Sequence, residues 1–172
     1  MTPREIVLEQ IRHHETDLVP YTLAFDPVVG TRLDEHFGSN AWRQRIVPYI
    51  VNCGAVCALW HAPPDPEHRL DKFGTLWRAD HTPPTVLKPG LAQPSFEGYD
   101  FPSVQDLLNT DAVANAAARA KETTDSFTLV HTGLCLWQSW YVRGFEETMM
   151  DCVAEEDFYA ELLDRLTDLT IG

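Results

Sequence analysis

The spacing of proline limits what this chain can fold into more than any other feature. Eight of its 12 prolines lie between residues 61 and 102. Proline has no backbone N–H and fixes its own φ, so a helix cannot run through that spacing. Inside the stretch, Leu70 to Ala79 is typical of a β-hairpin or an extended arm that turns near Gly74, with residues 85–87 as a further partner. The stretch holds too many aromatic residues for a solvated tether, so we predict a long arm inserted into a larger fold.

Two short apolar runs outside the arm, Val19–Phe25 and Phe127–His131, are predicted as buried parallel strands. Apolar residues on both faces suit a strand that is covered on both sides. Helices are predicted over 3–14, 31–37, from about 41 into the Cys53–Cys57 region, from 103, over 111–122, over 136–153 with an interruption near Gly144, and over 156–170. Strands that alternate with helices imply an α/β fold with a parallel sheet.

Two parallel strands are too few for a stable open sheet or a closed barrel. We therefore expect the chain to be truncated at the point where another strand should follow.

The chain's net charge of −13, from 13 basic and 26 acidic residues, disfavours nucleic acid as a partner. No apolar stretch is long enough to span a membrane, and the charged N-terminus lacks the features of a secretory signal. The four cysteines form no dense framework, which predicts reduced thiols in a cytoplasmic protein.

Four segments, taken in order, carry a resemblance to a known family. They are MTPREIVLEQIRHHETDLVP at the start, LDKFGTLWR in the arm, FPSVQDL, and TGLCLWQSWYVRGFEETMMDCVAEEDFYAELLDRLTD. Together they resemble the uroporphyrinogen decarboxylase-like superfamily, which includes the decarboxylase of haem biosynthesis and corrinoid-dependent methyltransferases. The resemblance implies that residues 1–172 form the N-terminal part of a (β/α)8 TIM barrel, with the β-hairpin arm inserted at about 61–102 and the C-terminal half absent. It places the active site at the carboxyl ends of the strands.

The residues favour the methyltransferase branch of that superfamily over the decarboxylase branch. The decarboxylases have an arginine- and glycine-rich segment after the first strand. The corresponding segment here is TLAFDPVVGTRLDEHFG, and Arg32 is its single arginine. A polycarboxylate porphyrinogen needs several fixed cations. Alignment on Gly144 puts Trp140, with Tyr141 beside it, where the decarboxylases have an active-site tyrosine, and Asp71 is the candidate for their essential aspartate. A porphyrinogen decarboxylase-like lyase is the alternative enzyme.

The methyltransferase branch implies two cofactors, neither of which this half is expected to hold. Its zinc ligands, a His-x-Cys pair and a later cysteine, belong to the second half of the barrel, and its corrinoid is carried by a partner protein. Zinc there would lower the pKa of an acceptor thiol. A third interpretation applies if 172 residues are the whole protein: a non-catalytic half-barrel that self-associates or binds a partner to cover its open edge.

No residue is assigned a catalytic step, but six are candidates for binding substrate. Asp26 and His131 end the two predicted strands, although Asp26 could instead cap the turn at Pro27. Trp140, Tyr141 and Arg143 cluster with Trp137 after the second strand, where these side chains either stack on a flat corrin or aromatic substrate or pack against Trp77 of the arm. Asp71 completes the set. Cys53, Cys57 and His61 would share a face of a continuous helix, as a zinc site or as core residues.

Overall fold

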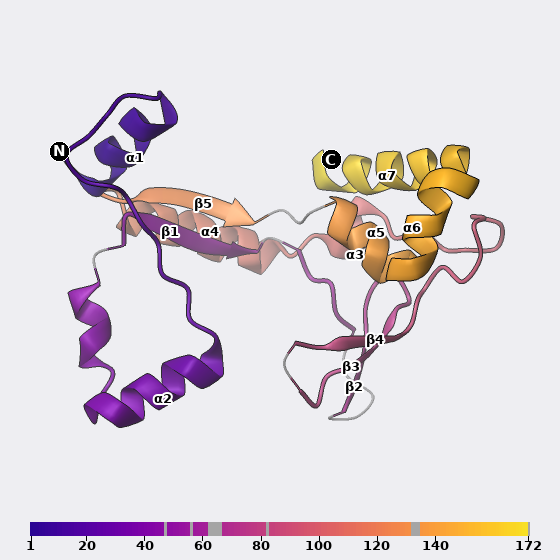
Figure 1. Ribbon diagram of the computed structural model, residues 1–172, viewed down its shortest axis with the longest axis horizontal. Coiled ribbons are helices and arrows are strands. Elements are labelled where there is room, and N and C mark those ends of the chain that lie inside the picture. Colours follow the sequence, from indigo (N-terminus) through magenta and orange to yellow (C-terminus); the bar gives the residue numbers. More distant parts are fainter. Residues whose placement is uncertain (47, 56, 62–66, 82, 132–134, 172) are drawn as a thin grey trace. The chain divides into compact units, whose positions relative to one another are not determined.

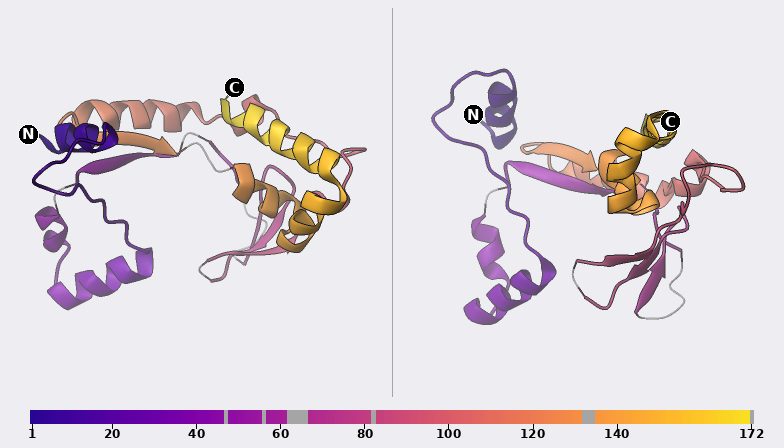
Figure 2. Two further views of the ribbon diagram at one scale, coloured as in Figure 1. Left: turned by 45° about the horizontal axis from the view of Figure 1, so that its top comes forward. Right: turned by 45° about the vertical axis from the view of Figure 1, so that its right-hand side comes forward.

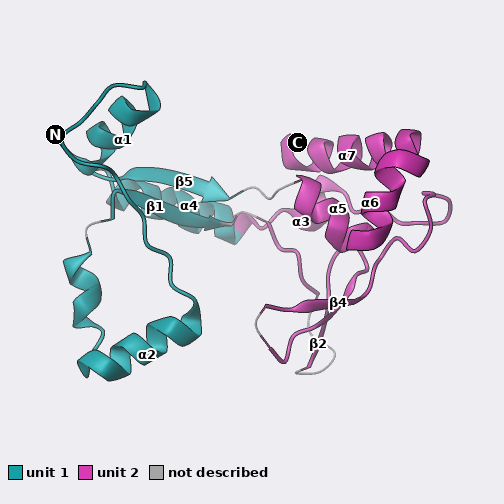
Figure 3. Ribbon diagram, viewed as in Figure 1, with its two compact units in different colours: residues 1–55, 111–131 teal, residues 56–110, 132–172 magenta. Residues whose placement is uncertain are grey.

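The computed structural model describes residues 1–46, 48–55, 57–61, 67–81, 83–131 and 135–171. It shows a mixed α/β fold that contains a parallel pair of strands and a small antiparallel sheet (Figures 1 and 2). The chain divides into two compact units, formed by residues 1–55 with 111–131 and by residues 56–110 with 132–172 (Figure 3). Among the described residues, no helix has both the length and the apolar character that crossing a membrane requires.

The first unit is built on a parallel pair of strands, β1 (Ile50–Ala55) and β5 (Phe127–His131). Ile50 lies opposite Phe127, and the register shifts between Asn52 and Ala55. Gly54 lies at this irregularity with a φ of 110°, a value that side chains with a Cβ disfavour. Strand β5 was predicted with the same bounds and as a parallel strand, and both are confirmed. The predicted burial is wrong, because Leu129 and Val130 are exposed.

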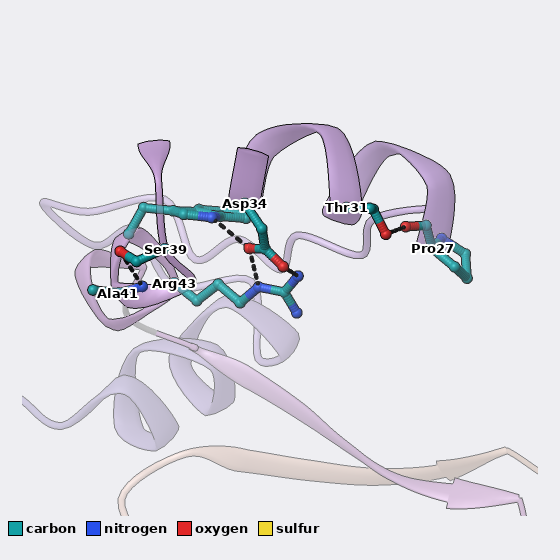
Figure 4. Close-up of polar contacts among 7 residues, drawn as sticks. Pro27, Thr31, Asp34, Ser39, Ala41 and Arg43 are labelled. Atoms are coloured by element: carbon teal, nitrogen blue, oxygen red, sulfur yellow. Dashed lines mark hydrogen bonds and ion pairs between the residues drawn. The ribbon is translucent and has the colours of Figure 1, made fainter. Parts of the chain in front are cut away.

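The N-terminal helices of this unit begin at sequence signals for capping. Helix α1 (Pro3–Ile11) has the predicted capping box, in which Thr2 accepts from Glu5 N while the Glu5 side chain accepts from Thr2 N. Helix α2 (Pro27–Phe37) ends at Gly38, which is left-handed. The unit is completed by the 3-10 helix η1 (Ala41–Arg45) and by α4 (Thr110–Glu122). Between α2 and η1, Asp34 accepts from the indole of Trp42 and from the guanidinium of Arg43 (Figure 4).

Two further predictions in the first unit are wrong. Val19–Phe25 forms no strand, and its large apolar side chains are exposed rather than buried. The helix predicted from residue 41 into the Cys53–Cys57 region is replaced by η1 and β1. Pro48 is incompatible with a helix interior, and the β-branched Ile50 and Val51 favour a strand after it. The side chain of Thr22 donates to Ile50 O at 3.3 Å, so segment 19–25 contacts β1 without a backbone ladder.

The second unit combines the arm with the C-terminal helices. Strands β2 (His68–Leu70), β3 (Leu76–Arg78) and β4 (Thr85–Lys88) form an antiparallel sheet in that order. The predicted hairpin is therefore confirmed, and it turns at Gly74, whose φ is 75°. Helix α3 (Val104–Leu107) begins at a second capping box, formed by Ser103 and Asp106.

Helices α5 (Cys135–Arg143), α6 (Phe145–Ala154) and α7 (Glu156–Ile171) follow, with the predicted interruption at Gly144. The core of this unit joins the arm to the helices. Leu162 and Leu166 of α7 belong to the apolar stripe predicted for that helix, and both are buried. They pack in one cluster with residues of the arm, α3 and α5: Phe73, Leu91, Leu107 and Val142.

Candidate functional site

The carboxylate of Asp71 organises the turn of the arm. Its Oδ1 accepts from the backbone N–H groups of Phe73 and Thr75, each at 2.9 Å, and its Oδ2 accepts from the indole N–H of Trp77 at 2.9 Å. Asp71 N also donates to Thr75 O at 3.0 Å. An aspartate that closes a turn in this way fixes the backbone around it. The sequence around Gly74 therefore places a carboxylate and an indole side by side.

Asp71 is 3% exposed, and among the described residues no lysine or arginine forms an ion pair with it. Burial raises the pKa of its carboxyl above the ordinary value of 3.8. The hydrogen bonds from Trp77, Thr75 and Phe73 act in the opposite direction, and the electrostatic effect of His61 is the smallest of these influences on the pKa. Among the described residues, Asp71 is thus a buried acid without a lysine or arginine partner, a kind of group that is concentrated at functional sites.

The arm meets helix α5 at Tyr141. Thr75 Oγ1 donates to Tyr141 O at 3.0 Å, across 66 residues of sequence. The rings of Trp77 and Tyr141 pack edge to face with centroids 4.8 Å apart, and Leu91 N donates to Val142 O at 2.8 Å. The predicted packing of this helix against Trp77 is confirmed.

Two cavities share the Trp77–Tyr141 pair as a wall. The smaller one, the Asp71 cavity, has a volume of about 230 Å³ and is bounded by Asp71 and mainly apolar or aromatic groups. Its other lining residues are Leu59, Trp60, Trp77, Pro83, Pro84, Gln138 and Tyr141. The larger one, the Trp140 cavity, has a volume of about 480 Å³ and reaches Trp140, Phe145 and Glu147. The indole N–H of Trp140 is buried and has no hydrogen-bond partner among the described residues.

Arg143 has a structural role rather than a position open to substrate. Its Nε donates to Asp151 Oδ2 at 2.7 Å, its Nη2 to Asp151 Oδ1 at 3.4 Å and its Nη1 to Ala92 O at 3.0 Å. Both side chains of the pair are less than a tenth exposed. The guanidinium therefore joins α5 to α6 and to the end of the arm.

The remaining two candidates lie in the first unit. Asp26 caps helix α2, where its Oδ1 accepts from Val28 N at 2.9 Å, which is the alternative role that the sequence offered. His131 is exposed at the end of β5 and lies opposite Ala55. The structure thus brings Asp71, Tyr141 and Trp140 around one pair of cavities and gives Asp26 and Arg143 local structural contacts.

The helical face predicted for Cys53, Cys57 and His61 does not exist. Cys53 is a buried residue of β1, whereas Cys57 forms an isolated antiparallel bridge with Leu108. Within the described ranges, no three histidine, cysteine or acidic side chains are grouped closely enough to hold a metal ion. These residues do not fit a zinc site.

Trp60 is an aromatic residue of the Asp71 cavity that the sequence interpretation missed. It forms an isolated antiparallel bridge with Asp71, and its ring packs edge to face on Trp77 at 5.7 Å. Its neighbours strengthen this pairing, since His61 N donates to Leu70 O and Lys72 N to Leu59 O. The apolar residues just before Pro63 were the available signal, because an extended segment before the prolines is as compatible with them as a helix end.

Comparison of the chain with protein-family models, with curated proteins and with solved structures gave no match.

Proposed function

We propose that the chain is part of a methyltransferase of the uroporphyrinogen decarboxylase-like superfamily, which moves a methyl group between a corrinoid protein and a thiol or pterin acceptor. One observation carries the proposal: two of the four segments that resemble this superfamily, LDKFGTLWR and the run that begins at residue 132, line the same cavities. Their contact runs through Thr75, Trp77 and Tyr141. Segments that supply a shared site are expected to meet in this way.

The walls of the Trp140 cavity suit a planar reactant. Its walls include the rings of Trp77, Trp140, Tyr141 and Phe145, on which a flat ring can stack. A buried indole N–H without an acceptor carries an energetic penalty that an acceptor atom of a ligand would remove. A pterin offers both a flat face and ring acceptors, so this cavity suits the acceptor side of the reaction.

The reaction needs a nucleophile and a methyl group on cobalt. The acceptor's sulfur or nitrogen forms the new bond to the methyl carbon, the electron pair of the carbon–cobalt bond stays on the corrinoid, and the acceptor's proton leaves to solvent. The sequence contains no His-x-Cys pair, and the described residues form no metal site. The proposal therefore assigns any zinc to residues outside this chain and derives no step through it.

The test uses the full-length protein with methylcobalamin as the free corrinoid and either homocysteine or tetrahydrofolate as the acceptor. We expect methylated acceptor by mass spectrometry, together with loss of the methylcobalamin absorption spectrum. Trp140→Phe removes the buried N–H and should reduce the rate several-fold with the pterin, whereas Trp137→Phe, on an exposed side chain outside both cavities, should not. No methylated acceptor, with carbon dioxide released from a porphyrinogen, would favour the lyase instead.

A second candidate function, binding of a partner, is favoured by the surface of the first unit. Val19 is 81% exposed, and the side chains of Leu18, Leu23, Phe25 and Val28 are also exposed. Within the described residues, β1 and β5 pair only with each other, so the sheet edges are open. Apolar surface and open edges of this kind are typical of an interface. Light scattering coupled to size exclusion tests this function, because a monomeric mass at every protein concentration would exclude self-association.

A further inference from the structure

We propose that the Asp71 cavity binds a small organic cation of the methylated ammonium class. This inference goes beyond methyl transfer, because it concerns binding alone and needs neither corrinoid nor turnover. Its basis is the combination of a buried carboxylate with three aromatic rings, those of Trp60, Trp77 and Tyr141, around one cavity. Aromatic cages of this composition bind quaternary ammonium groups through the negative faces of their rings.

Charge is the first argument. A buried carboxylate without a counter-ion is costly, and the cost falls when the group takes up a proton or a cation approaches it. The described lining of the cavity contains no lysine or arginine. The guanidinium of Arg69 lies 5.8 Å from the centroid of the Trp60 ring but is not part of the lining. His61 acts electrostatically on Asp71, but this is the smallest of the influences on its pKa. A cationic ligand would therefore supply a charge that the described lining of the cavity does not.

The limited number of hydrogen bonds that Asp71 can still accept favours an alkylated ammonium over a primary one. A carboxylate has about four acceptor positions, and Asp71 already accepts from Phe73 N, Thr75 N and Trp77 Nε1. A primary ammonium brings three donors, which the one position left by the described donors cannot satisfy in a cavity with mostly apolar walls. A quaternary ammonium has no N–H to satisfy, so its methyl groups can contact the rings while its charge faces the carboxylate.

Volume sets the size of the ligand. The Asp71 cavity, at about 230 Å³, is smaller than the roughly 300–1,000 Å³ of sites for drug-sized molecules. A corrin or a porphyrinogen exceeds it, whereas a trimethylammonium group with a short chain does not. The larger Trp140 cavity, on the other side of the Trp77–Tyr141 wall, remains for the reactant of the proposed function.

The experiment compares choline with its neutral isostere, in which a carbon atom replaces the nitrogen. Binding to the full-length protein is followed by calorimetry and by quenching of tryptophan fluorescence. We expect saturable binding of choline and at least about tenfold weaker binding of the isostere. Trp60→Ala should weaken choline binding, whereas Trp137→Ala should leave it unchanged. Trp60 is 40% and Trp137 51% exposed, so neither substitution creates a core cavity.

Three outcomes would overturn the inference: no saturable binding of choline, equal binding of choline and the isostere, or unchanged choline binding after Trp60→Ala. The first shows that the cavity takes no ammonium ligand, and the second shows an apolar cavity without selectivity for charge. The third shows that choline binds elsewhere. Failure of methyl transfer in the assay above has no bearing on these binding results, so the two proposals succeed or fail separately.

Discussion

The indole of Trp77 donates to the carboxylate of Asp71 at 2.9 Å, which links strand β3 to the residue that opens the hairpin turn. The other carboxylate oxygen is used by two backbone N–H groups of the same turn. One side chain thus holds the turn and forms part of a cavity wall. This dual role means that stability and ligand binding respond together to changes at Asp71.

Replacement of Asp71 by alanine should destabilise the second unit by on the order of 3 kcal/mol or more, because three buried donors lose their acceptor at once. Urea unfolding followed by circular dichroism measures the change. Asp80→Ala is the matched control, since Asp80 pairs with Arg78 and His81 on the exposed part of the same arm. An equal loss in both variants would contradict the role assigned to the Asp71 turn.

Two aspartates of the arm should titrate in opposite directions from the ordinary value of 3.8. Burial raises the pKa of Asp71, whereas hydrogen bonds from Arg78 and His81 lower the pKa of Asp80 to about 2. For Asp71 the folded state holds the proton more tightly than the unfolded chain, so its contribution to stability falls as the pH rises from 3.8 through the folded-state pKa. For Asp80 the contribution is present above pH 3.8 and is lost as the pH falls towards 2.

Carboxyl-carbon NMR across a pH series measures both pKa values in one sample. The Asp71 signal should move above pH 3.8 and the Asp80 signal well below it. Added salt should reduce the shift of Asp80, which is exposed to solvent, more than the shift of Asp71. An Asp71 midpoint at or below 3.8 would contradict the burial of an unpaired carboxyl.

Gly90→Ala should disrupt the close approach of residue 90 to the backbone of the hairpin turn at Phe73 and Gly74. A Cβ at residue 90 would lie 1.9 Å from Phe73 O and 2.9 Å from Phe73 C, both backbone atoms that cannot rotate away. Overpacking of this kind costs about 1–3 kcal/mol. Gly98→Ala is the comparison, because Gly98 has open space around it and only a φ of 69° to strain an alanine. Thermal unfolding should show the larger loss for Gly90→Ala.

The Arg143–Asp151 pair should be sensitive to removal of either partner. Arg143→Met leaves the buried Asp151 carboxylate unpaired, at a cost of about 3–5 kcal/mol. The double variant Arg143→Met, Asp151→Leu removes both charges and should recover much of that loss. Denaturant midpoints of the three proteins complete the comparison. Choline affinity should be unchanged in any variant that folds, since Arg143 is absent from the lining of the Asp71 cavity.

Local signals predicted most elements of this fold. The capping residues Thr2 and Ser103, the turn at Gly74 and the break at Gly144 act over a few residues, so the sequence reveals them directly. Strand β1 was missed because a short apolar run is compatible with either a helix or a buried strand, and only its pairing with β5 decides between them. Barrel closure involves pairing of the same non-local kind, and the strands described here do not form it.

Three members of the candidate site were predictable, but its arrangement was not. Asp71, Trp140 and Tyr141 were identified by resemblance, and the structure groups them around neighbouring cavities. The contribution of Trp60 to the cavity wall depends on the pairing of residues 59–61 with residues 70–72. No local pattern indicates that pairing. The burial of Asp71, which gives the site its chemical character, follows from the same long-range contacts.

The two compact units are interleaved along the chain, and this has a consequence for synthesis on the ribosome. Strand β1 emerges early, but its partner β5 follows only after the whole arm has been made. The arm in turn waits for α5 and α7 to cover Phe73 and Leu91. Each unit must therefore remain incomplete while a piece of the other is translated: the first unit waits until residue 131 has been made, and the second until its C-terminal helices have followed. The yield of folded protein should therefore depend more on slow elongation or on a nascent-chain chaperone than it does for two domains arranged in succession.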